Sequence, residues 1–346
     1  MQKQLRILSI GQMNGLSNTC LHRHWALEKV SDKIDVVNSS GHGSLWFRIA
    51  YHLFQYHIPV NLPDEAKANY KIKEFVDKNQ YDIVWIDKGI TIYPSTLKYI
   101  KEKQQHAQIV SYSPDNMALR HNQSRQYLKC LPFYDCVVTN KSYIIDDLKS
   151  LGAKNVLFVN NTFEPRFHHP YDLSKVETER LGGDVGFIGT WEKERCDIIR
   201  FLADNGINVR VWGSGKWNEY KWSSPNLEIM GDGLFSEDYS KAFKALKINL
   251  CFLRKMNYDQ QTTRSVEIPA CGGFMMAERT DEHKSLFEEN KEAVYFGSKE
   301  ELLEKCRYYL QHNEERNKIA EAGYLRCVND DYSNEGMVRN IIEHLN

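Results

Sequence analysis

The chain carries the stretch Asp259-Gln-Gln-Thr-Thr-Arg264-Ser-Val-Glu267-Ile-Pro-Ala-Cys-Gly-Gly-Phe-Met-Met-Ala-Glu278. Polar groups gather there just before and within a short apolar helix, which is expected to end at Gly272-Gly273. Carboxylates accept hydrogen bonds from sugar and ribose hydroxyls, whereas a cation and a helix start hold phosphate groups. Acids, an arginine and threonines in this arrangement are therefore typical of a site for a sugar nucleotide.

The spacing inside this stretch predicts how its charges are arranged. Asp259 and Glu267 are eight residues apart. If Thr262 or Thr263 caps the helix, Arg264 and Glu267 lie at i, i+3 on one face, near its electropositive end. The alternative interpretation is a solvated ion pair between Arg264 and Glu267 beside a buried helix, because such pairs are common on helix surfaces.

Composition narrows the class of protein. The chain has 346 residues, 42% of them hydrophobic and 26% charged, which suggests about two domains with ample core. The formal net charge of −1 provides no basic field for nucleic acid. No secretory signal precedes the first apolar strand, and no run approaches the roughly 18 apolar residues of a membrane span. The eight cysteines are scattered without metal-ligand spacing, so we expect reduced, buried cysteines in a cytoplasmic protein.

Short apolar strands alternate with helices along the chain. The expected strands are Leu5–Ile10, Ile34–Asn38, Tyr81–Ile86, Gln108–Tyr112, Cys136–Thr139, Val156–Val159, Asp184–Ile188, Val209–Trp212, Ile248–Phe252 and Ala293–Phe296. The expected helices include Ser44–His57, Asp64–Asn79, Ser95–Gln105, Cys196–Asn205 and most of the tail Ser298–Asn346, which opens on the capping box Ser298-x-x-Glu301. Such alternation indicates parallel sheets covered on both faces.

A break in the alternation predicts two domains. Glu164–Pro170 contains two prolines and polar residues, which is typical of a linker. We therefore expect two tandem Rossmann-like, doubly wound α/β domains, residues 1–168 and 169–330, with residues 331–346 as a terminal helix that packs back on the first domain. Ligands of such sheets bind outside the carboxyl ends of the strands, here in a cleft between the domains.

Several motifs resemble one known family. They are Gly186-Phe-Ile-Gly-Thr190 with Arg195, Val211-Trp-Gly-Ser-Gly-Lys-Trp217, Arg264-Ser-Val-Glu-Ile-Pro-Ala-Cys-Gly-Gly273, Phe287-Glu-Glu-Asn-Lys-Glu292 and, more loosely, Ser111-Tyr-Ser-Pro-Asp115. Together they resemble the spore-maturation-type (CgeB-like) glycosyltransferases, which have the GT-B fold and are close to the family-four retaining enzymes. The resemblance covers nearly the whole chain and is most specific in its second half.

The resemblance implies roles for the two acids of the opening stretch. Family-four enzymes carry a Glu-x7-Glu motif, in which the second acid binds the ribose and the first contacts the transferred sugar. Glu267 takes the second place here. Asp259 takes the first and is one methylene shorter, which bears on the sugar that is accepted.

The resemblance also places the diphosphate. The family usually has an arginine directly after the loop glycine, whereas Thr190 follows Gly189 here, and Arg195 takes the later cationic place. We infer that Arg264 supplies the missing positive charge. Fixed cations and helix N–H groups stabilise a departing nucleoside diphosphate without a metal. The sequence has no Asp-x-Asp metal motif, and we expect neither a metal nor a cofactor beyond the nucleotide-sugar substrate.

Glycine loops follow other expected strands. Gly213 and Gly215 resemble a loop that faces the phosphate or the base, although an ordinary turn has the same pattern. Gly231-Asp-Gly233 could meet the base or be a surface turn. Near the first strand, Gly11 and Gly15 resemble the acceptor-side glycine loop, a pattern that is common in α/β proteins.

Two acids end strands of the first domain. Asp115 follows a strand at the place where family-four enzymes often carry a histidine, and a carboxylate there could align the acceptor hydroxyl or act as a base. A turn aspartate after Pro114 is the equal alternative. Asp87 and Lys88 end the preceding strand and could line the same acceptor side.

The segment Ser44–His57 is a dense aromatic helix. Packing between domain layers is the favoured interpretation. A patch for a lipid-linked acceptor or a membrane surface is the less favoured alternative, because the basic face that an interfacial helix usually carries is thin here.

These patterns predict a bacterial-type glycosyltransferase that moves a sugar from a nucleotide donor to a hydroxyl of a glycan or lipid-linked acceptor, with retention. Two alternatives stay open. One is a nucleotide-sugar epimerase or hydrolase on the same scaffold, and the other is a catalytically silent sugar-nucleotide-binding protein.

Overall fold

A computed structural model describes residues 4–56, 58 and 60–345 of the chain. Its contacts divide the protein into two compact units. Unit 1 comprises Met1–Asn160 with Asn334–Asn346, and unit 2 comprises Asn161–Ser333. The segment Glu164–Pro170, which the prolines suggested as a linker, therefore belongs to unit 2.

Unit 1 alternates strands and helices in chain order. Its elements are β1 (Arg6–Gly11), α1 (Thr19–Val30), β2 (Lys33–Asn38), α2 (Leu45–Gln55), α3 (Ala68–Lys78), β3 (Ile83–Asp87), α4 (Pro94–Lys103), β4 (Gln108–Ser113), α5 (Arg125–Cys130), the 3-10 turn η1 (Leu131–Phe133), β5 (Cys136–Thr139), η2 (Ser142–Ile144), α6 (Ile145–Ser150), β6 (Val156–Phe158) and, from the chain's end, α14 (Asn334–Leu345). The strands form one parallel sheet in the order β2-β1-β3-β4-β5-β6.

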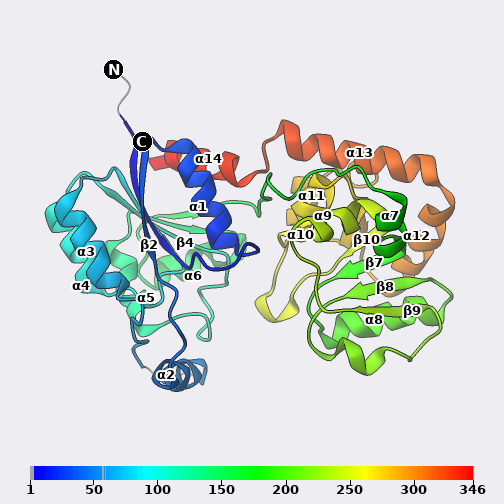
Figure 1. The fold of residues 1–346 in the computed structure, drawn as a ribbon, viewed down its shortest axis with the longest axis horizontal. Coiled ribbons are helices and arrows are strands. Elements are labelled where there is room, and N and C mark those ends of the chain that lie inside the picture. The colour runs from blue at the N-terminus through cyan, green and yellow to red at the C-terminus, as the bar shows by residue number, and fades with distance from the viewer. Residues whose placement is uncertain (1–3, 57, 59, 346) are drawn as a thin grey trace. The chain divides into compact units, whose positions relative to one another are not determined.

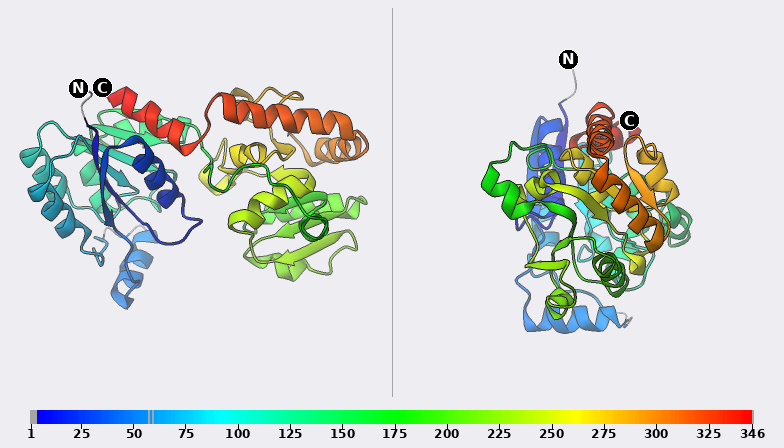
Figure 2. Two further views of the ribbon diagram at one scale, coloured as in Figure 1. Left: turned by 45° about the horizontal axis from the view of Figure 1, so that its top comes forward. Right: turned by 90° about the vertical axis from the view of Figure 1, so that its right-hand side faces the viewer.

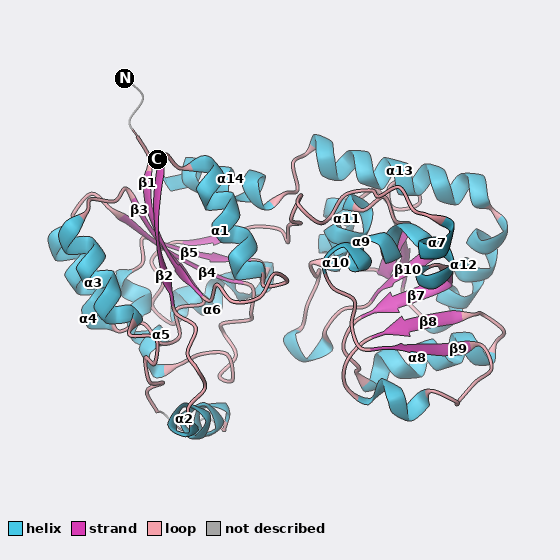
Figure 3. Cartoon of the chain, in the orientation of Figure 1, coloured by secondary structure: helices cyan, strands magenta, loops and turns pink. Residues whose placement is uncertain are grey.

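Helices cover both faces of this sheet because successive strand residues point to opposite sides (Figure 3). Leu8 and Ile10 pack in one apolar cluster with residues of α3, α4 and α5. Ile7 packs in the opposite cluster, to which α1 and α14 contribute. Figures 1 and 2 show α14 in red beside α1 in blue. The last helix thus completes one face of a sheet that begins at the first strand.

Unit 2 repeats the same architecture. Its elements are α7 (Lys175–Leu181), β7 (Gly183–Ile188), α8 (Lys193–Asp204), β8 (Val209–Trp212), η3 (Lys216–Tyr220), β9 (Leu227–Gly231), α9 (Ser236–Ala245), β10 (Leu246–Cys251), η4 (Lys255–Asn257), α10 (Arg264–Ala270), β11 (Met275–Glu278), α11 (Asp281–Leu286), β12 (Val294–Phe296), α12 (Lys299–Gln311) and α13 (Asn313–Asn329). The parallel sheet has the order β12-β11-β10-β7-β8-β9. Each unit is therefore a doubly wound, Rossmann-like α/β structure, as the sequence predicts.

Several local expectations differ from the structure. The third helix starts at Ala68, four residues late, because Asp64 caps it by accepting from the Ala68 and Asn69 N–H groups. Helix α8 starts at Lys193, so Arg195 lies in its first turn and not in a loop. The sequence analysis named neither β9 nor β11, which are short strands.

The Ser298 capping box is only half formed. Ser298 Oγ accepts from the Glu301 N–H at 3.1 Å. The Glu301 carboxylate turns instead to Arg279 and Lys305, so it does not return to the cap. All eight cysteines are buried and free of disulfides, as expected.

The aromatic helix α2 exposes several large apolar side chains. Only Ala50 and Phe54 of this helix are buried, whereas Leu45 is 68% exposed and Trp46 64% exposed. Packing against the rest of the protein therefore accounts for the apolar residues on only one side of the helix. His57, the expected last residue of the helix, lies outside the described residues.

Candidate functional site

The strand order of unit 2 defines where a ligand site is expected. The chain winds outward from β7 in one direction through β8 and β9, and in the other through β10, β11 and β12. The loops after β7 and β10 consequently diverge at their carboxyl ends and leave room for a ligand, the usual position in doubly wound sheets. The segments Gly189–Arg195 and Asp259–Glu267 follow these two strands.

The glycine loops after β7 and β8 lie against each other. The Gly189 N–H donates to the Trp212 carbonyl at 2.9 Å, and the Gly189 carbonyl accepts from the indole N–H of Trp217 at 2.9 Å. A Cβ on Gly213 would overlap that same Gly189 carbonyl oxygen, so the close approach requires glycine at position 213. Thr190 Oγ1 lies 3.3 Å from Ser214 Oγ, which ties the two loops together.

Gly215 of the same loop adopts a backbone conformation that favours glycine. Its φ is +91°, and an added Cβ would stand 3.0 Å from the Trp191 side chain. The predicted phosphate- or base-facing loop is therefore a rigid turn at the strand end.

Two arginines converge beside these loops. The guanidinium carbons of Arg195 and Arg264 lie 5.9 and 5.8 Å from the centroid of the same Phe187 ring. Arg264 also lies close to the backbone of the first loop, because its Nη1 would be 3.4 Å from a Cβ on Gly189. Arg195 is only 5% exposed and donates to the Thr190 carbonyl at 3.2 Å.

The charge of this arginine pair is only partly compensated. Burial and the neighbouring Arg264 both lower the pKa of Arg195. Glu192 lies 3.4 Å from Arg195, but within the described part of the chain no carboxylate forms an ion pair with Arg264. The Nε atoms of both arginines are buried without a hydrogen-bond partner among the described residues. The pair can therefore receive an anion, since buried donors and charges are stabilised by a partner.

The start of α10 is built differently from the predicted cap. Thr263 occupies the N-cap position, but its side chain makes no capping hydrogen bond. Ser265 Oγ instead accepts from the Thr262 N–H at 2.9 Å and contacts His283 Nε2 at 2.7 Å. The expectation that a threonine side chain caps this helix is wrong, because the hydroxyl of Ser265 reaches back from within the helix.

His283 orients this turn from α11. Its Nδ1 lies 2.7 Å from the Glu278 carbonyl, so Nδ1 carries the proton and Nε2 accepts from the Ser265 hydroxyl. Burial lowers the pKa of His283, which keeps the ring neutral. The sequence analysis missed this residue, since nothing in its local pattern links it to a helix 18 residues away.

Glu267 is a buried carboxylate and not half of a surface ion pair. It is 7% exposed, and Tyr239 donates its hydroxyl proton to Oε2 at 2.6 Å. His168 Nε2 lies 3.9 Å from Oε1. Among the described residues no ion pair joins Arg264 to Glu267, so the solvated-pair interpretation is wrong. Burial and the nearby Glu267 raise the pKa of Tyr239 well above its ordinary value, which keeps it a donor.

The sequence analysis missed the partners of Glu267. Tyr239 comes from α9, and His168 comes from the segment that was expected to be a linker. Both are far from Glu267 in sequence. Their roles depend on tertiary packing, for which a single sequence holds no local signal.

Asp259 lies in the loop that connects η4 to α10. Its N–H donates to the Arg254 carbonyl at 3.3 Å, and the preceding Tyr258 has a φ of +56°. The loop thus turns sharply just before Asp259. The structure gives no contact that joins Asp259 to Glu267, so the sugar-binding role of Asp259 stays a prediction.

The residues of unit 1 that were expected to face the acceptor lie near a strand-order switch, between β1 and β3. Gly11 ends β1, and a Cβ there would stand 3.0 Å from the Cβ of Asp87. Gly15 lies in the following loop with a φ of +87°. The glycine loop is therefore in the predicted place.

Asp87 has a structural partner. Arg23 Nε and Nη2 donate to its two carboxylate oxygens at 2.6 and 3.0 Å, and both side chains are 5% exposed. The Asp87 oxygens are thus engaged in a buried bidentate ion pair, and Asp87 also lines a small hollow together with Lys88 and Gly89, so its acceptor-side role stays a prediction.

Lys88 and Asp115 are joined at the ends of β3 and β4. The Lys88 amine lies 2.6 Å from Asp115 Oδ2, and the two side chains are 37% and 30% exposed. Asp115 is consequently a partly accessible carboxylate with an amine partner and not only a turn residue.

Two searches of the described residues concern the setting of the site. No group of three or more His, Cys, Asp or Glu side chains there could hold a metal ion. No described helix is long and apolar enough to cross a membrane.

Solved structures with the same fold define the class of architecture. HepE of Anabaena in complex with UDP-glucose is 14% identical, covers 99% of both chains and superposes with a TM-score of 0.63. Sucrose-phosphate synthase from Thermosynechococcus elongatus is 10% identical over 99% of both chains, with a TM-score of 0.66. A putative UDP-N-acetylglucosamine 2-epimerase from Listeria monocytogenes is 12% identical over 99% of this chain and 95% of that chain, with a TM-score of 0.54. Two Rossmann-like units of this kind constitute the GT-B fold.

Sequence comparison adds a family match over part of the chain. Residues 194–343 match the model of a family described as glycosyl transferase-like. This segment runs from α8 to α14 and includes Arg195, Arg264 and Glu267. No curated protein sequence matches the chain. The matched segment supports glycosyl transfer, whereas the fold by itself is shared with a putative epimerase.

Proposed function

We propose that this protein transfers a sugar from a nucleotide-sugar donor to an acceptor hydroxyl, with retention and without a metal. The observation that carries the proposal is the pair of the buried Arg195 and the partly buried Arg264 over Phe187, beside the Gly189 loop. A diphosphate between these guanidinium groups would satisfy their unpaired Nε donors and relieve their mutual repulsion. The family match over residues 194–343 supports the same assignment.

The chemistry then divides among a few groups. The bond between the sugar's anomeric carbon and the diphosphate oxygen breaks, and the nucleoside diphosphate leaves with both electrons. The acceptor oxygen forms the new bond to the anomeric carbon, and its proton passes to the departing diphosphate. Arg195 and Arg264 stabilise the charge that develops on the leaving group, which is the main requirement of such a reaction.

Two acids of unit 2 are assigned to the donor. Glu267 would accept hydrogen bonds from the ribose hydroxyls, since Tyr239 and His168 hold its carboxylate in place. Asp259 would contact the transferred sugar. In unit 1, Asp115 with its partner Lys88 would align the acceptor hydroxyl. The motifs of the resemblance favour a spore-maturation-type enzyme among the glycosyltransferases.

A donor screen tests the proposal. Nucleoside diphosphates of uridine, guanosine, adenosine and thymidine should be titrated calorimetrically, and the corresponding sugar donors should be incubated with the protein. A transferase should bind at least one diphosphate and consume its donor faster when an acceptor is present. An epimer or free sugar formed without acceptor would support the epimerase or hydrolase alternative. Binding without turnover across the panel would support the silent binding protein.

The exposed face of α2 supports a second element of the proposal, contact with a lipid surface that holds the acceptor. Trp46, Ile49 and Tyr56 are 64%, 42% and 68% exposed. Helix α2 has no acidic residue, and Arg48 and His52 are exposed on it, so the helix complements anionic lipid.

Vesicle flotation tests this contact. The protein should float with vesicles of mixed phosphatidylcholine and phosphatidylglycerol, and the double variant Trp46→Asp with Ile49→Asp should not. Tyr70→Ser is the matched control, because Tyr70 is an equally exposed aromatic residue (63%) on the neighbouring α3. Equal flotation of the double variant would exclude the α2 face.

A further inference from the structure

A second hollow of unit 2 lies at the opposite strand ends from the arginine pair. It has a volume of about 560 Å³ and is lined by the first residues of β10, the end of α9, the turn after α10 and one face of α13. Leu246 and Lys247 begin β10, and Phe274 directly precedes β11. The loops beside the arginine pair follow the carboxyl ends of the strands, whereas this hollow lies at their amino ends. The hollow is therefore a separate site. Its volume is within the range of about 300–1,000 Å³ that small-molecule sites occupy.

The lining carries a buried cation without a carboxylate partner. Arg316 is 7% exposed, and its Nη1 donates to the Tyr309 carbonyl at 2.6 Å. Within the described ranges no acid forms an ion pair with it. The acid that acts on it electrostatically, Asp184, is already bound by Lys247 at 2.7 Å and by Asn208 at 3.1 Å. Burial lowers the pKa of Arg316, which reflects the cost of holding this charge away from water.

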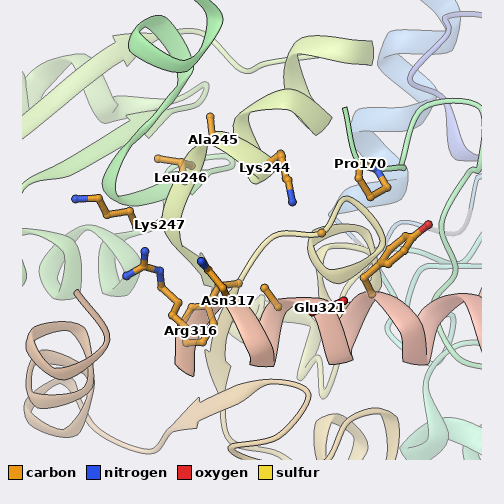
Figure 4. Close-up of a pocket in the computed structure, with 12 residues that line it drawn as sticks. Pro170, Lys244, Ala245, Leu246, Lys247, Arg316, Asn317 and Glu321 are labelled. Carbon is orange, nitrogen blue, oxygen red and sulfur yellow. The ribbon is translucent and has the colours of Figure 1, made fainter. Parts of the chain in front are cut away.

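A second cation faces the same hollow from the opposite side. Lys244 ends α9, and its amine would be 3.3 Å from a Cβ on Gly272, at the rim of the hollow. No ion pair of Lys244 is found in the described part of the chain. Figure 4 shows Lys244 reaching from α9 toward α13, while Arg316 and Asn317 project from α13 toward the strand residues. The hollow therefore carries positive charge on both sides, which attracts an anionic ligand.

The remaining lining indicates what the anion is attached to. A bare phosphate would fill only a small part of the hollow, whereas Asn317, Glu321 and Tyr324 lie on the same face of α13. Amide and carboxylate groups bind hydroxyls, and Tyr324 and Pro170 add apolar surface to the lining. Glu321 is exposed, so it can accept from a hydroxyl without opposing the buried cation.

We propose that this hollow binds a small phosphorylated sugar, which the positive charges of Lys244 and Arg316 attract and whose hydroxyls bind Asn317 and Glu321. The site is distinct from the donor site, and its occupancy does not depend on the function proposed above. Loss of donor binding and loss of binding in this hollow should consequently be separable.

Calorimetric titration with glucose 6-phosphate tests the proposal, with inorganic phosphate and glucose as comparison probes. The full-length protein should bind glucose 6-phosphate at least about tenfold more tightly than either comparison probe, since both halves of the site contribute. Lys244→Ala should weaken binding about tenfold or more, and Lys244→Glu should abolish it. Lys241→Ala is the matched control, because Lys241 lies one turn earlier on α9 and pairs with Glu177 and Glu237.

Arg316 is buried, so a conservative substitution is used to avoid unfolding the protein. Arg316→Lys keeps the charge and should still weaken binding, because one amine replaces a forked donor. Arg264→Ala should leave glucose 6-phosphate binding unchanged while it weakens nucleoside diphosphate binding. The proposal is overturned if the wild-type protein binds no glucose 6-phosphate at about 20 mM ligand. It is also overturned if Lys244→Glu binds glucose 6-phosphate as tightly as the wild type does, or if a nucleoside diphosphate displaces glucose 6-phosphate competitively.

Discussion

Replacing Arg264 with alanine separates a ligand-binding role of this side chain from a structural one. Its guanidinium carbon and that of Arg195 each lie within 5.9 Å of the Phe187 centroid, so the two charges are at most about 12 Å apart. At an effective dielectric constant near 20, charges at that distance repel each other by about 1.4 kcal/mol. Arg264→Ala removes this repulsion and also the contact with Phe187, which contributes about 0.5–2 kcal/mol.

These two effects on the folded state oppose each other, so we expect a change in unfolding free energy within about 1 kcal/mol. For a unit of this size that corresponds to a shift in Tm of about 2–4 °C. The effect on the bound state has no such compensation. A lost hydrogen bond to a charged group costs about 1.5–3 kcal/mol, which is roughly a 10- to 150-fold loss of nucleoside diphosphate affinity. Turnover should fall at least as much, because the charge on the leaving group grows in the transition state.

Calorimetry provides both readouts on the same samples, as a titration with the preferred nucleoside diphosphate and a thermal scan without ligand. Arg264→Lys should recover part of the affinity, since it restores the charge but not the forked donor. Arg180→Ala is the control, because Arg180 is a half-exposed arginine of the same unit that pairs with Asp238. A fall in Tm of more than about 8 °C with affinity reduced less than threefold would refute the binding role.

Four further outcomes follow from the structure. Glu267→Ala should lower Tm, because it leaves the buried Tyr239 hydroxyl unpaired at a cost of about 1–3 kcal/mol, whereas Glu267→Gln should keep Tm and lose nucleoside diphosphate affinity; equal Tm values would contradict the buried hydrogen bond. Burial lowers the pKa of His283 below its usual 6.5, so the unfolded chain binds a proton that the folded protein does not, and stability measured by denaturant titration should fall as pH drops from 7 to 5; His283→Gln should flatten this dependence. Asp87→Ala should destabilise the protein by about 3–5 kcal/mol through an unpaired buried arginine, whereas Lys88→Ala should cost less than about 1 kcal/mol in the same denaturant titration; similar costs would argue against a buried ion pair. Transfer rates in excess EDTA should equal those without it, and restoration by added Mg²⁺ or Mn²⁺ would exclude metal independence.

The architecture could be predicted from the sequence because it depends on local patterns. Short apolar runs between helices indicate buried parallel strands, and the glycines that end them mark the loops. Gly189, Gly213 and Gly11 lie at the strand ends where this pattern places them. The strands that the sequence did not predict, such as β9 and β11, are short. Too few residues lie in them to show a recognisable hydrophobic periodicity.

The sequence by itself determined the two doubly wound units, the strand-end loops and the acids and arginines that could form a site. Only the tertiary structure decided which of those side chains are engaged with the protein. Asp87 is held by Arg23 and Glu267 by Tyr239, whereas Arg264 keeps an unpaired buried donor beside Arg195. The physical reason is that charge and hydrogen-bond partners come from elements far apart in the chain. Packing brings them together, and no local pattern of residues encodes which partners will meet.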